Sequence, residues 1–234
     1  MNTKRLLLGI FLLLSFFVVL AIIFMPVFGN GKNGLEFADD FFNSLAKGSS
    51  NYMDEMRELS KGFVNVPLAA EINMDSHEKA QKTAALYKEA GAEVAVSGAV
   101  VKIKGDLGRI LLKSIDDAEA MFLNQGGKLQ AQYHYGAKEV LRNWWLSLIK
   151  LEKALKKQKK FKEAKATAAV RERAVEPGYN FFGITPASVG ERVGLLTLML
   201  VLYVIYTLWF GYGIYELFNG LGLGMEKPVA KKEV

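Results

Sequence analysis

The chain has 234 residues, of which 51% are hydrophobic, and its formal net charge at neutral pH is +6. It contains no cysteine. Disulfides, iron–sulfur clusters, thiolate zinc sites and covalently attached c-type haem are therefore excluded within this chain. The absence of a free thiol also fits an oxidising compartment.

Two long apolar runs dominate the chain, Leu6–Phe28 directly after Lys4-Arg5 and Val193–Tyr215 near the C-terminus. At about 1.5 Å per residue, each is long enough to cross a hydrocarbon layer of about 30 Å. The predicted organisation is a short N-terminal tail, a first membrane helix, one extramembrane domain, a second membrane helix and a short basic tail. The corresponding ranges are 1–5, 6–28, 29–190, 191–218 and 219–234.

The charges that flank the two runs suggest an orientation. Lys4 and Arg5 precede the first run, and three lysines, Lys227, Lys231 and Lys232, follow the second. The positive-inside rule then places both termini in the cytoplasm and the domain outside the cytoplasmic membrane, as in a two-pass protein with a periplasmic domain. A cleaved signal peptide ending near Val27-Phe28-Gly29 is the alternative, but the apolar stretch exceeds the length usual for such peptides.

Helical spacing governs the first part of the domain. After a glycine-rich exit at residues 29–34, apolar residues recur at intervals of three and four from Leu35 to Leu45 and again from Met53 to Leu59. The second helix is expected to end near Gly62, and Pro67 is expected to lie in a loop.

A compact α-β-β-α unit is expected over residues 75–123. Asp75 and Glu78 form a capping box that begins a helix, which should run to about Ala90. Alternating apolar residues on either side of Ser97-Gly98 then predict a short hairpin. Asp106 should cap the helix that follows.

The longest helix is expected over residues 128–176. Its apolar residues repeat with a 3-4-3-4 spacing that is typical of a heptad seam, Leu141, Trp144, Leu148, Leu151 and Leu155. A continuous helix of this length would measure about 70 Å, so part of it should project or pack against another element. The seam could meet a partner helix or pack within its own domain, and intramolecular packing is the safer expectation.

Residues that could carry catalysis are sparse. His77 and His134 lie outside both apolar runs and give no haem or metal ligand set; His134 is expected to be partly buried beside two tyrosines. The adjacent pairs Asp39-Asp40 and Asp116-Asp117 point in different directions on a helix and should be solvated. No nucleophile elbow and no phosphate-binding glycine loop is present. We therefore expect neither an enzyme nor a resident cofactor or metal.

Two surfaces are candidates for contact with partners. In the second run, Tyr203, Tyr206, Phe210, Gly211 and Gly213 combine aromatic side chains with small residues, which suits contact with another membrane helix. Within the lysine-rich stretch 150–165, Lys156, Lys157, Lys159 and Lys160 could contact anionic lipid or an acidic partner, or could simply be solvated. Nucleic acid is not expected, because the lysines fall on all faces of the helix.

The fold class expected from these patterns is a mainly α membrane protein. Two membrane helices flank a mostly helical domain that contains the small α-β-β-α unit. The leading functional hypothesis is a non-catalytic accessory or scaffolding subunit of a membrane protein complex, with other membrane subunits and lipid as partners and a homo-oligomer also open. The alternatives are an extracytoplasmic ligand-sensing domain that signals through a separate cytoplasmic partner and, less favoured, an envelope or transport adaptor.

Overall fold

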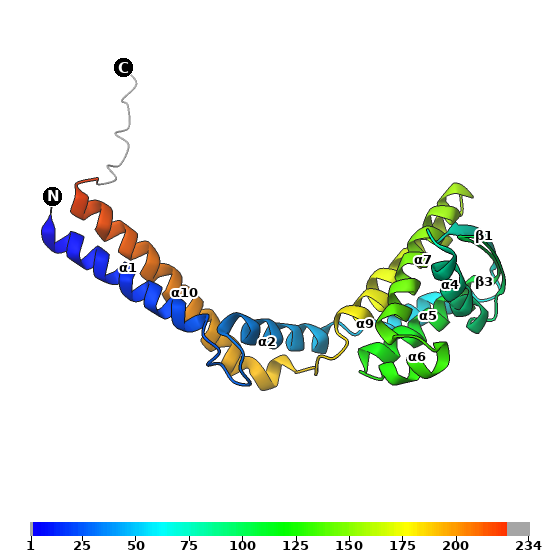
Figure 1. Cartoon of the computed structure of the whole chain (residues 1–234), viewed down its shortest axis with the longest axis horizontal. Helices are drawn as coiled ribbons and strands as arrows, with labels where there is room; N and C mark the ends of the chain where they lie inside the picture. Colours follow the sequence, from blue (N-terminus) through cyan, green and yellow to red (C-terminus); the bar gives the residue numbers. More distant parts are fainter. Residues whose placement is uncertain (1, 224–234) are drawn as a thin grey trace, which may run out of the picture. The chain divides into compact units, whose positions relative to one another are not determined.

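The computed structural model describes residues 2–223, so the predicted basic tail lies largely outside the described residues. The described chain is mostly helical with one small sheet (Figure 1). The helical elements are α1 Thr3–Ile23, α2 Gly34–Ser49, α3 Met53–Lys61, α4 His77–Glu89, α5 Leu107–Phe122, α6 Gly126–Tyr133, α7 Ala137–Lys157, α8 Phe161–Val170, the π-helical turn η1 Arg171–Val175, α9 Glu176–Asn180 and α10 Val189–Leu221. The strands are β1 Pro67–Asn73, β2 Glu93–Ser97 and β3 Val100–Asp106.

The chain divides into two compact units. One comprises the described parts of Met1–Phe42 and Ala187–Val234 and contains α1 and α10; the other is Asn43–Pro186. The boundary falls inside α2.

The first unit pairs α1 with α10, the two helices within residues 2–223 that are long and apolar enough to cross a membrane; we call this pair the hairpin. The helices run antiparallel: the Asn2 N–H donates to the Gly220 carbonyl at 2.9 Å, and further along α1 Gly9 faces Leu217, which precedes Gly220 on α10. A methyl group added at Gly9 would lie only 2.4 Å from the Leu217 nitrogen. Glycine at this position therefore allows the two backbones to approach closely.

The ends of the apolar helices differ from the expected ranges. α1 ends at Ile23, before Pro26, so the last residues of the expected range 6–28 form a turn. A proline disfavours helical geometry in the residue before it, which explains why the apolar run outlasts the helix. α10 is longer than expected. Its 33 residues would measure about 50 Å, and its first turn carries Glu191 and Arg192.

The second unit contains a three-stranded antiparallel sheet in the order β1-β3-β2. β1 and β2 both run antiparallel to β3 and hence parallel to each other, and α4 connects them. β1 was not expected, because Pro67 was interpreted as part of a loop. The alternating exposure of its side chains shows the signal that was present: Leu68, Ala70 and Ile72 are buried while their neighbours are exposed. A proline is compatible with the first residue of an edge strand.

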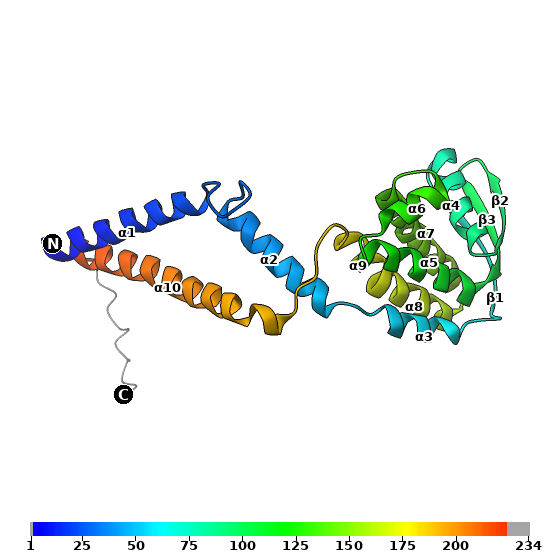
Figure 2. The same ribbon diagram turned by 90° about the horizontal axis from the view of Figure 1, so that it is seen from below.

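The helices cover one face of this sheet (Figure 2). The buried residues of β1 and β3 join those of α4, α5 and α7 in one hydrophobic core. The opposite face is polar and carries the Glu71–Lys102 pair, with 3.6 Å between Oε2 and Nζ. Side chains from α7 and the turn after it cover the outer edge of β1, because Lys150, Gln158 and Lys160 donate to its backbone carbonyls. This contact protects an otherwise open strand edge.

The single helix expected over 128–176 is instead a series of shorter helices. His134, with a φ of 62°, ends α6, and a turn at Lys159, also with a φ of 62°, separates α7 from α8. α8 packs back against α7, so Ala164 and Val170 join the same core as the seam. Burial of the seam within the domain stabilises this broken arrangement over a projecting helix.

The helix caps show one agreement and one correction. Asp106 caps α5 as predicted, accepting from the Arg109 N–H at 2.9 Å. The cap of α4 is Ser76, whose hydroxyl accepts from the Lys79 N–H, and not Asp75. Asp75 instead has a positive φ of 70° and pairs with Lys150 at 2.8 Å.

A buried lysine joins the two ends of the second unit. The Lys47 ammonium, on a side chain that is almost fully buried, donates to the carbonyls of Phe181 and Ile184 at 3.0 and 2.6 Å and to Asn124 Oδ1 at 3.2 Å. Asn124 also donates to the Ile184 carbonyl and accepts from the Gly183 N–H. We call Lys47, Asn124, Phe181 and Ile184 the lysine clasp. Burial lowers the pKa of Lys47 below its ordinary value.

Candidate functional site

The predicted contact residues of α10 divide between two faces. Tyr206 and Phe210 pack against Phe16 of α1, with ring centroids 4.2 and 4.8 Å apart, and Gly213 lies against Leu13. These three positions therefore serve the hairpin within the chain. Tyr203 is 66% exposed, and a side chain added at Gly211 would meet nothing within 4 Å, so these two positions face outward.

The outward face of α10 contains a groove and an unpaired polar group. The groove has a volume of about 380 Å³ and is lined by Gly211, Ile214, Tyr215, Phe218, Asn219 and Leu223. Within residues 2–223, the buried Nδ2 of Asn219 has no hydrogen-bond partner, and neither does the buried indole nitrogen of Trp209. Sequence reasoning named Gly211 on this face but overlooked Asn219.

The heptad seam lies inside its own domain. Leu141, Trp144, Leu148, Leu151 and Leu155 are all fully buried in the core of Asn43–Pro186. Their apolar surfaces are thus already covered by residues of the same unit. Intramolecular packing, the safer of the two expectations, describes their position.

Asp117 is a correction to the prediction of two solvated carboxylates. Asp116 is exposed and pairs with Arg57, but Asp117 is buried. Its carboxylate accepts hydrogen bonds from the Tyr133 hydroxyl at 2.6 Å, the Trp144 indole at 2.7 Å and the Lys113 ammonium at 2.6 Å. Burial, followed by the charge of Asp117, raises the pKa of Tyr133. This network joins α5, α6 and α7 in the core.

The four candidate lysines lie at the turn between α7 and α8. Lys156 pairs with Glu152 at 2.5 Å, and Lys160 donates weakly to the Pro67 carbonyl at 3.4 Å. Lys157 and Lys159 are exposed. The lysines that the sequence singled out therefore include two that support local structure and two that remain available to a partner.

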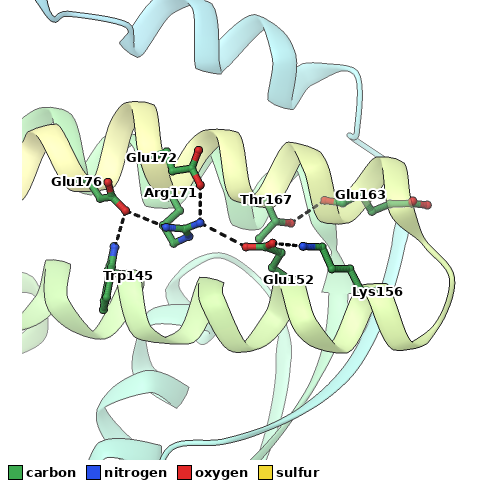
Figure 3. Close-up of polar contacts among 8 residues, drawn as sticks. All are labelled: Trp145, Glu152, Lys156, Glu163, Thr167, Arg171, Glu172 and Glu176. Carbon is green, nitrogen blue, oxygen red and sulfur yellow. Dashed lines mark hydrogen bonds and ion pairs between the residues drawn. The ribbon is translucent and has the colours of Figure 1, made fainter.

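A second polar network connects α7 with the π-helical turn η1 (Figure 3). Arg171 donates to Glu176 at 2.8 Å, to Glu172 at 2.6 Å and to Glu152 at 3.4 Å. The indole of Trp145 donates to the same Glu176 oxygen at 2.7 Å. Burial opposes ionisation of Glu152, but its hydrogen bond to Lys156 and the nearby positive charges hold its pKa below the ordinary value.

The π-helical turn explains how Arg171 and Glu176 meet. They are five residues apart, a spacing that places two side chains on different faces of an α-helix. In a π-helix the hydrogen bonds run from residue i to i+5, so residues at this spacing share a face. Because the sequence was interpreted with α-helical spacings of three and four, this pair was missed.

A half-open hollow lies beside this network. Its volume is about 380 Å³, and it is lined by Arg142, Trp145, Glu176, Tyr179 and Asn180. Trp145 and Tyr179 supply aromatic surface, and Arg142 is exposed. Four residues before Arg142 on α7, the Lys138 ammonium lies 5.9 Å from the centroids of the Tyr179 and Phe182 rings. The volume is within the range of small-molecule sites.

The histidines do not form a metal centre. His77 is exposed near the start of α4, where its ring contacts the Gly98 carbonyl and Gln81. His134 was expected to be partly buried, but it is exposed at the C-terminal cap of α6. Within the described part of the chain, no group of three or more potential metal-ligating side chains comes together.

Comparison of the chain with protein-family models, with curated proteins and with solved structures finds no significant match. The functional proposals below therefore depend on the geometry of the chain itself.

Proposed function

We propose that this chain is a non-catalytic accessory or scaffolding subunit of a membrane protein complex. In this proposal, α1 and α10 cross the cytoplasmic membrane, both termini are cytoplasmic, and the domain lies outside. The outward face of α10 contacts a transmembrane helix of another subunit. Lipid covers the remaining outer surface of the hairpin.

The observation that carries this proposal is the outward-facing groove at Gly211 on α10. Asn219, whose Nδ2 has no hydrogen-bond partner within residues 2–223, lies in the last turn of α10, one residue beyond the expected membrane range 191–218. Gly211 leaves open space in which another backbone could approach closely. A helix seated in the groove could therefore fill its volume in close contact with α10.

The hairpin supports the retention of α1 as an anchor. Close glycine contacts at Gly9, Gly213 and Gly220 fit α1 to α10, as expected of two helices that remain together in the membrane. A signal peptide removed after secretion would leave this face of α10 uncovered.

The test is isolation of the native full-length protein in a mild detergent, followed by native mass analysis. A defined set of other membrane proteins at a fixed ratio is expected to co-migrate. Gly211→Leu should remove them, because the new side chain fills the groove. Gly194→Leu is the matched control, since a side chain there also meets open space on α10. A lone monomer, or equal loss of partners in both variants, would contradict the proposal.

Orientation has its own test. Protease added outside spheroplasts should cut within residues 43–186 while leaving tags at both termini intact. Protection of the domain, with cleavage of the tags, would reverse the proposed topology.

A ligand-sensing domain is the second candidate function, favoured by the hollow beside Arg142. In that case the domain would signal through a separate cytoplasmic partner. Ligand-dependent stabilisation would distinguish it from a purely structural subunit, and would amount to about 2.7 kcal/mol at a ligand concentration of one hundred times Kd.

A further inference from the structure

We infer that the hollow formed by Arg142, Trp145, Glu176, Tyr179 and Asn180 is a binding site for a small organic anion with a flat apolar body, such as an aromatic carboxylate. All five residues belong to the second unit, so this site does not depend on the proposed membrane partner.

The charge of the site favours an anion. Lys138 and Arg142 are four residues apart on α7 and therefore share a face, where like charges repel. Within residues 2–223, neither side chain forms an ion pair with a carboxylate. A carboxylate placed between the guanidinium and the ammonium would relieve this repulsion. Arginine is also suited to bind a carboxylate with two parallel hydrogen bonds.

The one acidic side chain in the lining does not oppose this assignment. Glu176 Oε1 already accepts hydrogen bonds from both Arg171 and Trp145. Arg171 is shared among Glu152, Glu172 and Glu176, and together with the Trp145 indole it holds the Glu176 carboxylate in this network. The cations at the hollow that do not share this network are Arg142 and Lys138.

The aromatic walls favour a flat apolar body. Trp145 is half-buried, and a hydrogen bond to Glu176 fixes its indole. Arg171, in the π-helical turn, donates a hydrogen bond to the same Glu176 carboxylate (Figure 3). Tyr179 is 37% exposed and forms part of the same lining. A wall that is fixed before binding reduces the loss of side-chain entropy on binding.

The experiment is ¹⁹F NMR titration of 4-(trifluoromethyl)benzoate against the full-length chain in zwitterionic detergent, with empty micelles as the blank. Two matched probes test the class: 4-(trifluoromethyl)benzylamine has the ring but the opposite charge, and trifluoroacetate has the charge without the ring. The benzoate is expected to bind saturably, and both other probes at least about tenfold more weakly. Equal binding of the amine, equal binding of trifluoroacetate, or no saturable binding of the benzoate would overturn the inference.

Substitutions locate the site. Arg142→Gln should weaken the benzoate by about tenfold, the loss expected for one charge-assisted hydrogen bond. The affinity of Arg142→Lys for the benzoate should lie between those of the wild type and Arg142→Gln. Arg109→Gln is the control, because Arg109 is equally exposed but lies on α5. Unchanged affinity in Arg142→Gln, in a protein with a wild-type melting temperature, would place binding elsewhere. If that variant melts early, Tyr179→Leu supplies the test, because loss of one aromatic wall should weaken the benzoate without affecting trifluoroacetate.

Discussion

Replacement of Asp117 by leucine should strongly destabilise the second unit. The buried carboxylate accepts hydrogen bonds from Tyr133 Oη, Trp144 Nε1 and Lys113 Nζ, all within 2.7 Å. Leucine has a similar size but accepts none of them. Two buried neutral donors would lose their partner, at about 1–3 kcal/mol each, and the lysine would lose its counter-charge.

The expected loss in the free energy of unfolding is about 3–5 kcal/mol, because removal of one partner from a buried ionic network typically costs this much. Leucine also avoids the cost of burying a charged carboxylate, which offsets part of the summed loss of the individual hydrogen bonds. The adjacent residue provides a matched control. Asp116→Leu removes an exposed ion pair with Arg57 and should cost no more than about 1 kcal/mol.

Urea unfolding of the full-length protein in detergent, followed by tryptophan fluorescence, measures both variants. A double-mutant cycle of Asp117→Leu with Tyr133→Phe should give a coupling of about 0.5–3 kcal/mol. The reasoning is refuted if the Asp117 and Asp116 variants unfold at the same urea concentration. It is also refuted if Asp117→Leu is the more stable of the two.

Further predictions concern the hairpin, the lysine clasp and Tyr135. Gly9→Leu should separate α1 from α10, because a side chain at this position meets the Leu217 backbone. Crosslinking between cysteines introduced into the two helices should then fail. It should persist in the control Gly194→Leu, where a side chain meets open space. Lys47→Met should cost about 1–3 kcal/mol by leaving carbonyl oxygens unpaired. Because the pKa of Lys47 is lower in the folded chain, the unfolded chain binds one more proton between that lowered pKa and the ordinary value of 10.5. The wild-type free energy of unfolding should therefore rise with pH over this range, and the rise should be smaller in Lys47→Met. An equal rise in the wild type and in Lys47→Met would contradict the assignment. Burial raises the pKa of Tyr135 to about 12, so the tyrosine ionises first in the unfolded chain. The free energy of unfolding should therefore fall as the pH rises above 10. Measured by alkaline unfolding curves, this fall should be smaller in Tyr135→Phe.

Local patterns in the sequence predicted several elements well. Asp106 as a helix cap, Ser97-Gly98 as a hairpin turn and the two apolar helices all depend on interactions between residues close in sequence. Such short-range signals are independent of the rest of the fold. They therefore identify an element even when its tertiary partners are unknown.

The features that were missed depend on contacts between distant residues. Asp117 resembles its exposed neighbour in sequence, and only its position against Trp144, twenty-seven residues away, makes it a buried acceptor. The continuous helix over 128–176 was expected because its spacing is helical on both sides of Lys159. Packing of α8 onto α7 decides in favour of the turn there.

The candidate site illustrates the same limit. Arg142 and Trp145 lie on one helix and could be paired from spacing alone, but Glu176 and Tyr179 reach them only through the fold. No α-helical period would place Arg171 beside Glu176. A search for oppositely charged residues at a spacing of five would have detected that pair.

The lysine clasp gives the second unit a defined response to force. Lys47 belongs to the segment by which the chain enters this unit, and Phe181 and Ile184 belong to the segment by which it leaves. Tension applied to the two connecting segments would therefore act first on the hydrogen bonds of a single ammonium group. The sheet and the helices beyond the clasp should bear load only after those bonds, and the bonds of Asn124 to Gly183 and Ile184, have broken.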